Sequence, residues 1–203
     1  MDIKIIDISR ELLSDTPYPG DPAASVSVFS AISRGDSCNM AEIRTTLHNG
    51  THADAPLHFV QTGKSITQLP LEAFIGECQV IEVPEGRITG EYVNKYFPRT
   101  QKRILIKGNG KAFFDKTGAE EAAFLGISLI GTDGDSIGEV GGNEIGPHRA
   151  FMDENIAILE RLDLSGVKPG KYILVAQPLK IQGVEASPVR ACLLDGYIFW
   201  SKS

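Results

Sequence analysis

The sequence predicts an α/β domain that combines a mixed β-sheet with a few short helices. Two observations lead to this fold class. Nine apolar runs have the length of β-strands, and three short segments between them have a helical pattern. The 21 glycines and 11 prolines are spread along the whole chain, with no linker-like stretch and no internal repeat. We therefore expect residues 1–203 to form one domain.

The expected strands are short, rich in aliphatic and β-branched residues, and bounded by turn residues. In chain order the expected strands are Ile3–Ile8, Ser25–Ile32, Ala41–Leu47, Gln79–Val83, Arg103–Lys107, Ile127–Gly131, Ile156–Glu160, Tyr172–Gln177 and Val189–Leu194.

Three expected helices lie between these strands. Thr89 and Thr117 each carry a hydroxyl that can accept a hydrogen bond from the first free amides of a helix. Pro147 suits a first helical turn, where its missing N–H costs nothing. The expected helices are Thr89–Tyr96, Thr117–Leu125 and Pro147–Asn155.

Composition and charge exclude several classes of partner. The net charge is −6, from 20 basic and 26 acidic residues, and no cluster of Lys and Arg stands out, so we expect no nucleic-acid partner. No apolar run approaches the roughly 18 residues of a membrane span. Cys38, Cys78 and Cys192 are an odd number and far apart, which predicts reduced thiols that serve as small buried hydrophobes. Because charges interrupt the first residues, where a signal peptide needs an apolar core, we expect a cytoplasmic protein.

Three of the four histidines fall within eleven residues, in the segment His48-Asn-Gly-Thr-His52-Ala-Asp54-Ala-Pro-Leu-His58. Positions 48, 52, 54 and 58 are all even, so in an extended chain their side chains point to one face. A straight strand would spread them over about 33 Å, at about 3.3 Å per residue. The chain must therefore bend, and Asn49-Gly50 and Ala55-Pro56 are natural places for the bends. Thr51 is expected to brace this loop with its hydroxyl.

Imidazole and carboxylate side chains are usual ligands of Zn²⁺, Mn²⁺ and Fe²⁺. A carboxylate such as Asp54 can also bridge two metal ions, which imidazole cannot do. The histidine segment therefore predicts a metal site, and a polar loop with solvated histidines is the alternative. Glu160 ends an apolar run, where a carboxylate is costly unless it is ion-paired or metal-bound. His148 opens the preceding helix, and it could equally be a surface histidine.

The segment from His48 to His58 resembles the HxGTHxDAPxH signature of the cyclase family, which includes bacterial kynurenine formamidases and isatin hydrolase. The resemblance extends over nearly the whole chain. Its supporting segments are Asp7-Ile-Ser9, Pro17-Tyr-Pro-Gly-Asp21, Pro147-His148-Arg149 with Ile158-Leu-Glu160, Pro178-Leu-Lys180 and Ala186-Ser-Pro-Val-Arg-Ala191. It implies a swivelling β/β/α-like fold that is a homodimer or homotetramer.

The resemblance also implies a role for each site residue. His48, His52 and Asp54 would bind one metal ion and His148 a second, with Asp54 and Glu160 bridging or sharing the two. His58 would be the acid/base group beside the metals. The implied cofactor is one or two Zn²⁺ ions per chain, with Mn²⁺ as the alternative.

The implied activity is hydrolysis of a non-peptide C–N bond by metal-activated water, with N-formylkynurenine as the leading substrate in tryptophan catabolism. Formamidases carry a Trp in the substrate loop where this chain has Tyr18, so Tyr18 is expected to stack on a planar amide or imide. The loop Thr132–Gly146, with Asp133, Asp135 and Ser136, also departs from the formamidase pattern. The alternatives are a cyclic imide or lactone hydrolase, a cyclase that uses the same metals, and a metal-holding protein that binds a carbonyl ligand without turning it over.

Overall fold

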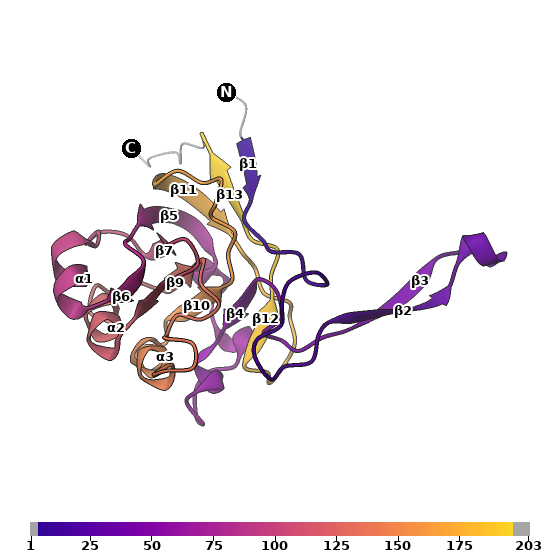
Figure 1. Ribbon diagram of the computed structural model, residues 1–203, viewed down its shortest axis with the longest axis horizontal. Helices are drawn as coiled ribbons and strands as arrows, with labels where there is room; N and C mark the ends of the chain where they lie inside the picture. The colour runs from indigo at the N-terminus through magenta and orange to yellow at the C-terminus, as the bar shows by residue number, and fades with distance from the viewer. Residues whose placement is uncertain (1–3, 197–203) are drawn as a thin grey trace.

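The centre of the computed structural model, which describes residues 4–196, is a curled mixed sheet of nine strands (Figure 1). This architecture confirms the α/β fold class. In spatial order the strands are β1 (Lys4–Asp7), β13 (Cys192–Asp195), β11 (Gly170–Val175), β5 (Ile75–Glu82), β7 (Arg103–Lys107), β9 (Leu129–Thr132), β10 (Ala157–Glu160), β4 (His52–Asp54) and β12 (Ala186–Pro188).

The four central strands β5, β7, β9 and β10 are parallel, and the flanking strands pair antiparallel. Parallel neighbours need long crossover connections, which here carry the helices α1 (Gly90–Tyr96), α2 (Lys116–Ala123) and α3 (Ile145–Met152). The three helices lie together on one side of the sheet (Figure 1). A further pair of short parallel strands, β6 (Gly86–Ile88) and β8 (Ala112–Phe114), lies in the same crossovers.

The central strands bury side chains on both of their faces. Along β7, Ile104 and Ile106 belong to the core under the helices, whereas Leu105 between them belongs to the core on the opposite face. Phe114 and Phe151 fill the helix-side core with an edge-to-face contact, their ring centroids 5.3 Å apart. Burial on both faces explains why these strands read in the sequence as continuous apolar runs.

The predicted helices all exist, but two begin elsewhere than expected. Helix α3 begins at Ile145, two residues before the expected start at Pro147, and ends at Met152 rather than at Asn155. Thr89 caps α1 as predicted, because its hydroxyl accepts a hydrogen bond from the Tyr92 amide at 3.3 Å. The expected start at Thr117 is wrong. Asp115 caps α2 instead, with its carboxylate accepting from the Gly118 amide at 2.8 Å. An aspartate two residues upstream is an equally strong cap and takes the position.

The expected strands were found with shifted ends, and Ile3 of the first one lies outside the described residues. Ser25–Ile32 and Ala41–Leu47 become β2 (Ser25–Ser30) and β3 (Met40–Arg44), which form a separate two-stranded sheet. This hairpin, called the arm below, projects far from the rest of the molecule (Figure 1). Cys38, in the arm, is exposed, so its predicted burial is wrong, whereas Cys78 is buried and Cys192 half-buried.

No helix within residues 4–196 is both long enough and apolar enough to cross a membrane.

Candidate metal centre and active site

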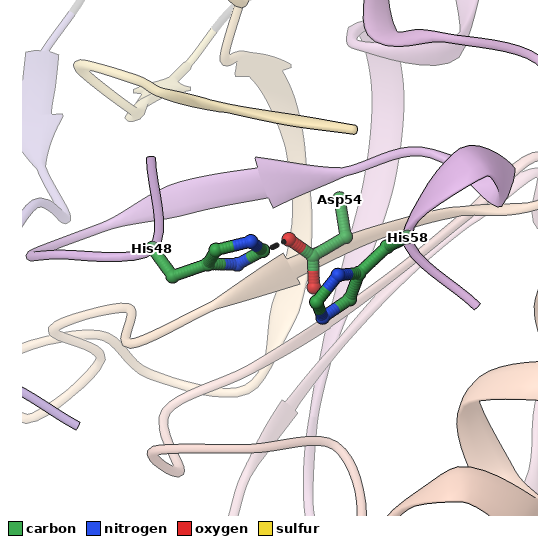
Figure 2. A group of neighbouring side chains, drawn as sticks. All are labelled: His48, Asp54 and His58. Atoms are coloured by element: carbon green, nitrogen blue, oxygen red, sulfur yellow. Dashed lines mark ion pairs between the residues drawn. The ribbon is translucent and has the colours of Figure 1, made fainter. Parts of the chain in front are cut away.

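Strand β4 places two of the predicted site residues on one face of the sheet. His52 and Asp54 are separated by one residue in an extended segment, so their side chains point the same way. Both bends expected around the strand are present. Gly50 has φ 61°, and Pro56 begins a short 3₁₀ turn, Pro56–His58. These bends carry His48 and His58 back toward Asp54, and Figure 2 shows the two imidazoles on either side of its carboxylate.

The sheet register adds the distant carboxylate. Strand β10 runs antiparallel to β4, and Glu160 is the direct partner of His52. Side chains of such partners share one face of the sheet, and Glu160 Oε2 lies 3.4 Å from His52 Nε2. The other oxygen, Oε1, accepts a hydrogen bond from the Ile137 amide at 2.7 Å. Strand pairing alone therefore brings together His52 and Glu160, which are more than 100 residues apart in the sequence.

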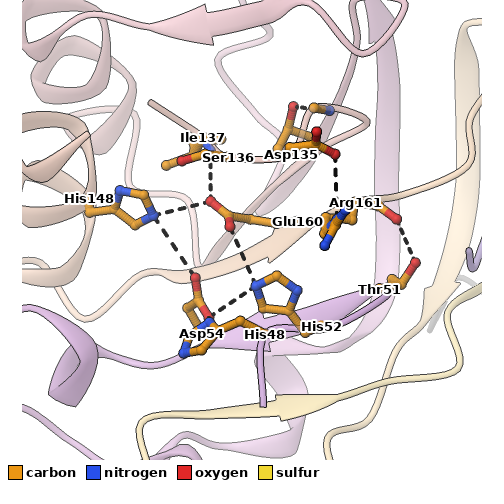
Figure 3. Close-up of polar contacts among 12 residues, drawn as sticks. His48, Thr51, His52, Asp54, Asp135, Ser136, Ile137, His148, Glu160 and Arg161 are labelled. Carbon is orange, nitrogen blue, oxygen red and sulfur yellow. Dashed lines mark hydrogen bonds and ion pairs between the residues drawn. The ribbon is translucent and has the colours of Figure 1, made fainter. Parts of the chain in front are cut away.

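Helix α3 contributes the fourth histidine. His148 Nε2 lies 3.1 Å from Glu160 Oε1 and 4.0 Å from Asp54 Oδ2 (Figure 3). The other ring nitrogen, Nδ1, lies 2.8 Å from the carbonyl oxygen of Glu144. His52 is held in the same manner, with Nδ1 3.0 Å from the Gly50 carbonyl. With Nδ1 of each ring beside a carbonyl oxygen, Nε2 is the nitrogen of both rings that faces the carboxylates.

Asp54 is fully buried, and neither of its carboxylate oxygens accepts a hydrogen bond. Oδ1 is nevertheless 3.1 Å from His48 Nδ1 and 3.5 Å from His52 Nε2. Nε2 of His52 also lacks a hydrogen-bond partner. A buried carboxylate without hydrogen bonds is costly unless a cation compensates it, so these unpartnered atoms fit a bound metal ion.

Two groups of side chains in the described part of the chain have ligand atoms close enough to share an ion. One contains His48, Asp54 and His58, and the other contains His52, Asp54 and Glu160, with all ligand atoms of a group within 4.8 Å of one another. Asp54 belongs to both groups, which is the position expected for a bridging carboxylate. The grouping differs from the one implied by the sequence resemblance, because His58 here stands beside His48 and Asp54.

The electrostatics of the centre follow from packing acids against imidazoles in a buried cluster. Burial opposes charge on His48, but the carboxylates of Asp54, Glu160 and Glu185 raise the pKa of its imidazole to about 9. Burial likewise opposes charge on His148, and Glu160 raises its pKa to about 9. His58 differs, since burial holds its pKa below the ordinary value for histidine. Burial raises the pKa of Glu160, but His148 and His52 overcome this and hold it well below its usual range.

The cluster opens into a cavity of about 360 Å³. The structure brings Tyr18, Asp135 and Ser136 from two distant loops into its wall, together with the histidines. The Tyr18 hydroxyl donates a hydrogen bond to Glu144 Oε1 at 2.5 Å, so its proton is not free for a ligand. The wall consists of Tyr18, Asp21, His48, His52, His58, Phe59, Asp135, Ser136, Glu144, Ile145, His148 and Glu160. Asp133, by contrast, does not line the cavity and accepts hydrogen bonds from the Gly108 amide at 3.0 and 3.1 Å.

A buried arginine braces the loop that carries Tyr18. Arg161 is only 2% exposed and has the left-handed backbone conformation, with φ 61°. Its Nε lies 3.3 Å from Asp15 Oδ2 and 3.4 Å from Asp135 Oδ1, and its Nη2 donates to the Thr16 carbonyl. Sequence reasoning missed Arg161, because arginine is rarely buried. It also missed Glu144, Asp21 and Glu185, whose loop positions carry no periodic signal.

The carbonyl oxygen of Arg161 also accepts a hydrogen bond from the Thr51 hydroxyl, at 2.6 Å. The same hydroxyl accepts from the Arg10 amide at 2.8 Å. Thr51 therefore braces the loop before β4, as predicted.

Comparison with known proteins agrees with this architecture. Residues 6–139 match the family model described as "Putative cyclase". The chain is 33% identical to a kynurenine formamidase from Salinibacter ruber, over 94% of this chain and 97% of that protein. A solved structure of a potential metal-dependent hydrolase with cyclase activity superposes with a TM-score of 0.83, at 25% identity, and covers 97% of this chain and 100% of that one.

Isatin hydrolase A from Labrenzia aggregata shares the fold, with a TM-score of 0.82 at 21% identity, over 95% of this chain and 93% of that one. The family match contains the whole segment from His48 to His58, and the similarity to a formamidase covers 94% of this chain. The chain therefore belongs to the Cyclase family.

Proposed function

We propose that this protein is a metal-dependent amidohydrolase that cleaves an aryl formamide, with N-formylkynurenine as its substrate and kynurenine and formate as its products. The observation that carries the proposal is the fully buried Asp54, whose unpartnered oxygens lie among imidazoles at a cavity. The relative named kynurenine formamidase, 33% identical over almost the full length, supports the choice of substrate.

We propose that His48, His52, Asp54, His148 and Glu160 hold one or two metal ions. Zn²⁺ is our first choice because the set is rich in imidazole nitrogen, and Mn²⁺ is the alternative because it also accepts carboxylate oxygen. When bound, such an ion supplies Lewis acidity, which stabilises negative charge on a carbonyl oxygen and makes water a nucleophile near neutral pH.

The protein's own side chains then have two tasks. Hydrolysis forms a bond between the water oxygen and the formyl carbon, breaks the C–N bond, and moves a proton from water to the departing nitrogen. We propose that His58 carries this proton, since it lies in the cavity wall beside the other histidines. Its ring centroid is 4.3 Å from that of His48 and 6.0 Å from that of His148. Tyr18 is proposed to stack on the aryl ring from the same wall.

A substrate panel tests the function directly. We expect the purified protein to hydrolyse N-formylkynurenine with a kcat/KM well above its values for isatin and for simple lactones, because the open-chain formamide matches the relatives' activity. Formate release and the absorbance of the free arylamine measure the turnover. Preference for isatin or a lactone would replace the formamidase by the cyclic imide or lactone hydrolase. Binding without any turnover would favour a metal-holding binding protein.

We also propose that the protein is a homodimer or homotetramer, assembled through the arm. Several large apolar side chains are exposed on this hairpin, and no other helix or strand of residues 4–196 covers them (Figure 1). Contiguous apolar surface of this kind marks interfaces, and a second copy of the chain is the partner that is always present. The exposed residues are Val26, Val28, Phe29, Ile32, Met40 and Ile43.

The expected result for the arm is a loss of assembly when its apolar side chains become charged. Light scattering after size exclusion should give a dimer or tetramer for the native protein and a monomer for the double variant Val28→Asp, Phe29→Asp. Phe124→Asp is the matched control, because Phe124 is 86% exposed at the end of α2 and should leave assembly unchanged. A monomeric native protein would contradict the proposal.

We further propose a cytoplasmic location. The three free cysteines support it, because thiols persist in a reducing compartment.

A further inference from the structure

The cavity wall is acidic at the side where Tyr18 stands. Asp21, Asp135, Glu144 and Glu160 all line it, and residues 4–196 contribute no lysine or arginine to the wall. Two of these carboxylates already have basic partners. Glu160 faces His52 and His148. Asp135 is paired with Arg10 at 2.7 Å and with Arg161 at 3.4 Å.

The other two carboxylates have no basic partner within residues 4–196. Asp21 accepts only a long hydrogen bond of 3.4 Å from the Thr46 hydroxyl. Glu144 accepts from the Tyr18 hydroxyl at 2.5 Å and from the Gly141 amide at 3.0 Å, and both bonds end on Oε1. Oε2 of Glu144 is therefore left to accept from a ligand. Burial and the neighbouring Glu144 raise the pKa of Tyr18, which keeps its ring a neutral phenol between the two acids.

Glu144 is also fixed with respect to the metal centre. Its backbone carbonyl accepts from Nδ1 of His148, one helical turn along α3, at 2.8 Å. His52, which lines the same cavity, presents a buried Nε2 that has no hydrogen-bond partner. The cavity wall thus combines two kinds of group. One is the imidazole–carboxylate cluster with unsatisfied atoms, and the other is the Tyr18 ring, whose hydroxyl is bonded to the carboxylate of Glu144.

We propose that Glu144, assisted by Asp21, binds an ammonium group of the substrate and so determines specificity. The inference rests on the proposed formamidase function and names the part of the substrate that is recognised. N-formylkynurenine carries both an α-ammonium and an α-carboxylate. The wall offers carboxylate acceptors and an aromatic face, which suit an ammonium, but no basic side chain for the carboxylate. The ammonium is therefore the recognised group and the carboxylate is dispensable.

The test is a charge series of four aryl formamides. Formanilide is neutral, N-formylkynurenine is a zwitterion, and its decarboxylated analogue N-formylkynuramine is a cation. The deaminated analogue, 3-(2-formamidobenzoyl)propanoate, is an anion. For the native holoenzyme we expect kcat/KM for the cation to be at least equal to that for N-formylkynurenine, and to exceed that for the anion by about 10-fold or more. The preference should weaken at high ionic strength.

Glu144→Gln separates recognition from a purely structural role. Glutamine keeps an oxygen that can accept from Tyr18 and Gly141, but it removes the charge. We expect the ratio of kcat/KM for cation over anion to fall by about 10-fold in this variant, with a smaller fall in Asp21→Asn. Glu154→Gln is the matched control, since Glu154 is exposed beyond the end of α3, and its ratio should equal that of the native protein.

Two outcomes overturn the inference and are distinguishable from each other. Equal loss on all four substrates in Glu144→Gln, or equal use of cation and anion by the native enzyme, would show that Glu144 only holds Tyr18 in place. In that case the formamidase function stands and the ammonium site does not. Failure of the native holoenzyme to hydrolyse any of the four substrates would overturn the proposed function, and the inference with it.

Discussion

Asp54→Asn is expected to remove most of the bound metal and, with it, the activity. The carboxylate is the one group shared by both sets of ligand atoms, and an amide bridges two cations poorly. We expect the loss of metal affinity to exceed the roughly 10-fold to 100-fold loss typical of an outer partner of a metal ligand. Metal analysis of the purified variant, together with turnover of N-formylkynurenine, measures both effects.

The control for Asp54→Asn is Asp153→Asn, which changes an exposed carboxylate after the end of α3. It should keep the native metal content and turnover. Because Asp54 is fully buried, the fold of the variant is checked by circular dichroism, and Glu160→Gln provides a second loss of a carboxylate in the same centre. A folded Asp54→Asn protein with native metal content would contradict its assignment as a ligand.

His58→Ala is expected to do the opposite, keeping most of the metal and losing turnover by a factor on the order of 10²–10⁴, the usual contribution of a positioned acid/base group. His58 lies on the 3₁₀ turn after β4, half-buried in the cavity wall, and forms no ion pair with a carboxylate of the described residues. Its pKa is lowered by burial, so the imidazole is neutral near pH 7 and able to accept a proton.

Parallel metal analysis and single-turnover kinetics separate the two roles of His58. His48→Ala is the comparison, because His48 contacts Asp54 directly and should lose metal as well as turnover. The proximity of His58 to His48 and Asp54 makes the measurement decisive. If His58→Ala loses metal as severely as Asp54→Asn, His58 is a ligand and the proton must be carried by another group.

The local half of the site could be predicted from the sequence because its geometry is set within eleven residues. The alternation of His52 and Asp54 along β4 fixes their common face, and the bends at Gly50 and Pro56 bring His48 and His58 to it. These are short-range properties of the backbone.

The distant half depended on the resemblance, because strand pairing decides it. Nothing local in the sequence states that Glu160 lies opposite His52, or that α3 brings His148 to the same point. The acids of the cavity wall, Glu144 and Asp21, were missed for a related reason. Both acids are distinguished by the absence of a basic neighbour among the described residues, and only the folded structure shows this.

The arm shows that the sequence predicts strands without predicting where they pair. Its two strands were predicted because Ser25–Ile32 and Ala41–Leu47 are apolar runs of strand length. The pattern says nothing about what covers the apolar face, and β2 and β3 leave the main sheet altogether. Short strands β6, β8 and β12 escaped prediction because three residues are too few to show a period.

The central claim is that hydrolysis of a formamide by this protein depends on a metal ion held by the His–Asp–Glu cluster. Its most direct test is to strip the native protein with a chelator and titrate Zn²⁺ or Mn²⁺ back while following N-formylkynurenine hydrolysis and bound metal together. We predict that activity falls to background and returns in step with one or two ions bound per chain. Full activity in protein shown by metal analysis to be free of metal would contradict the account.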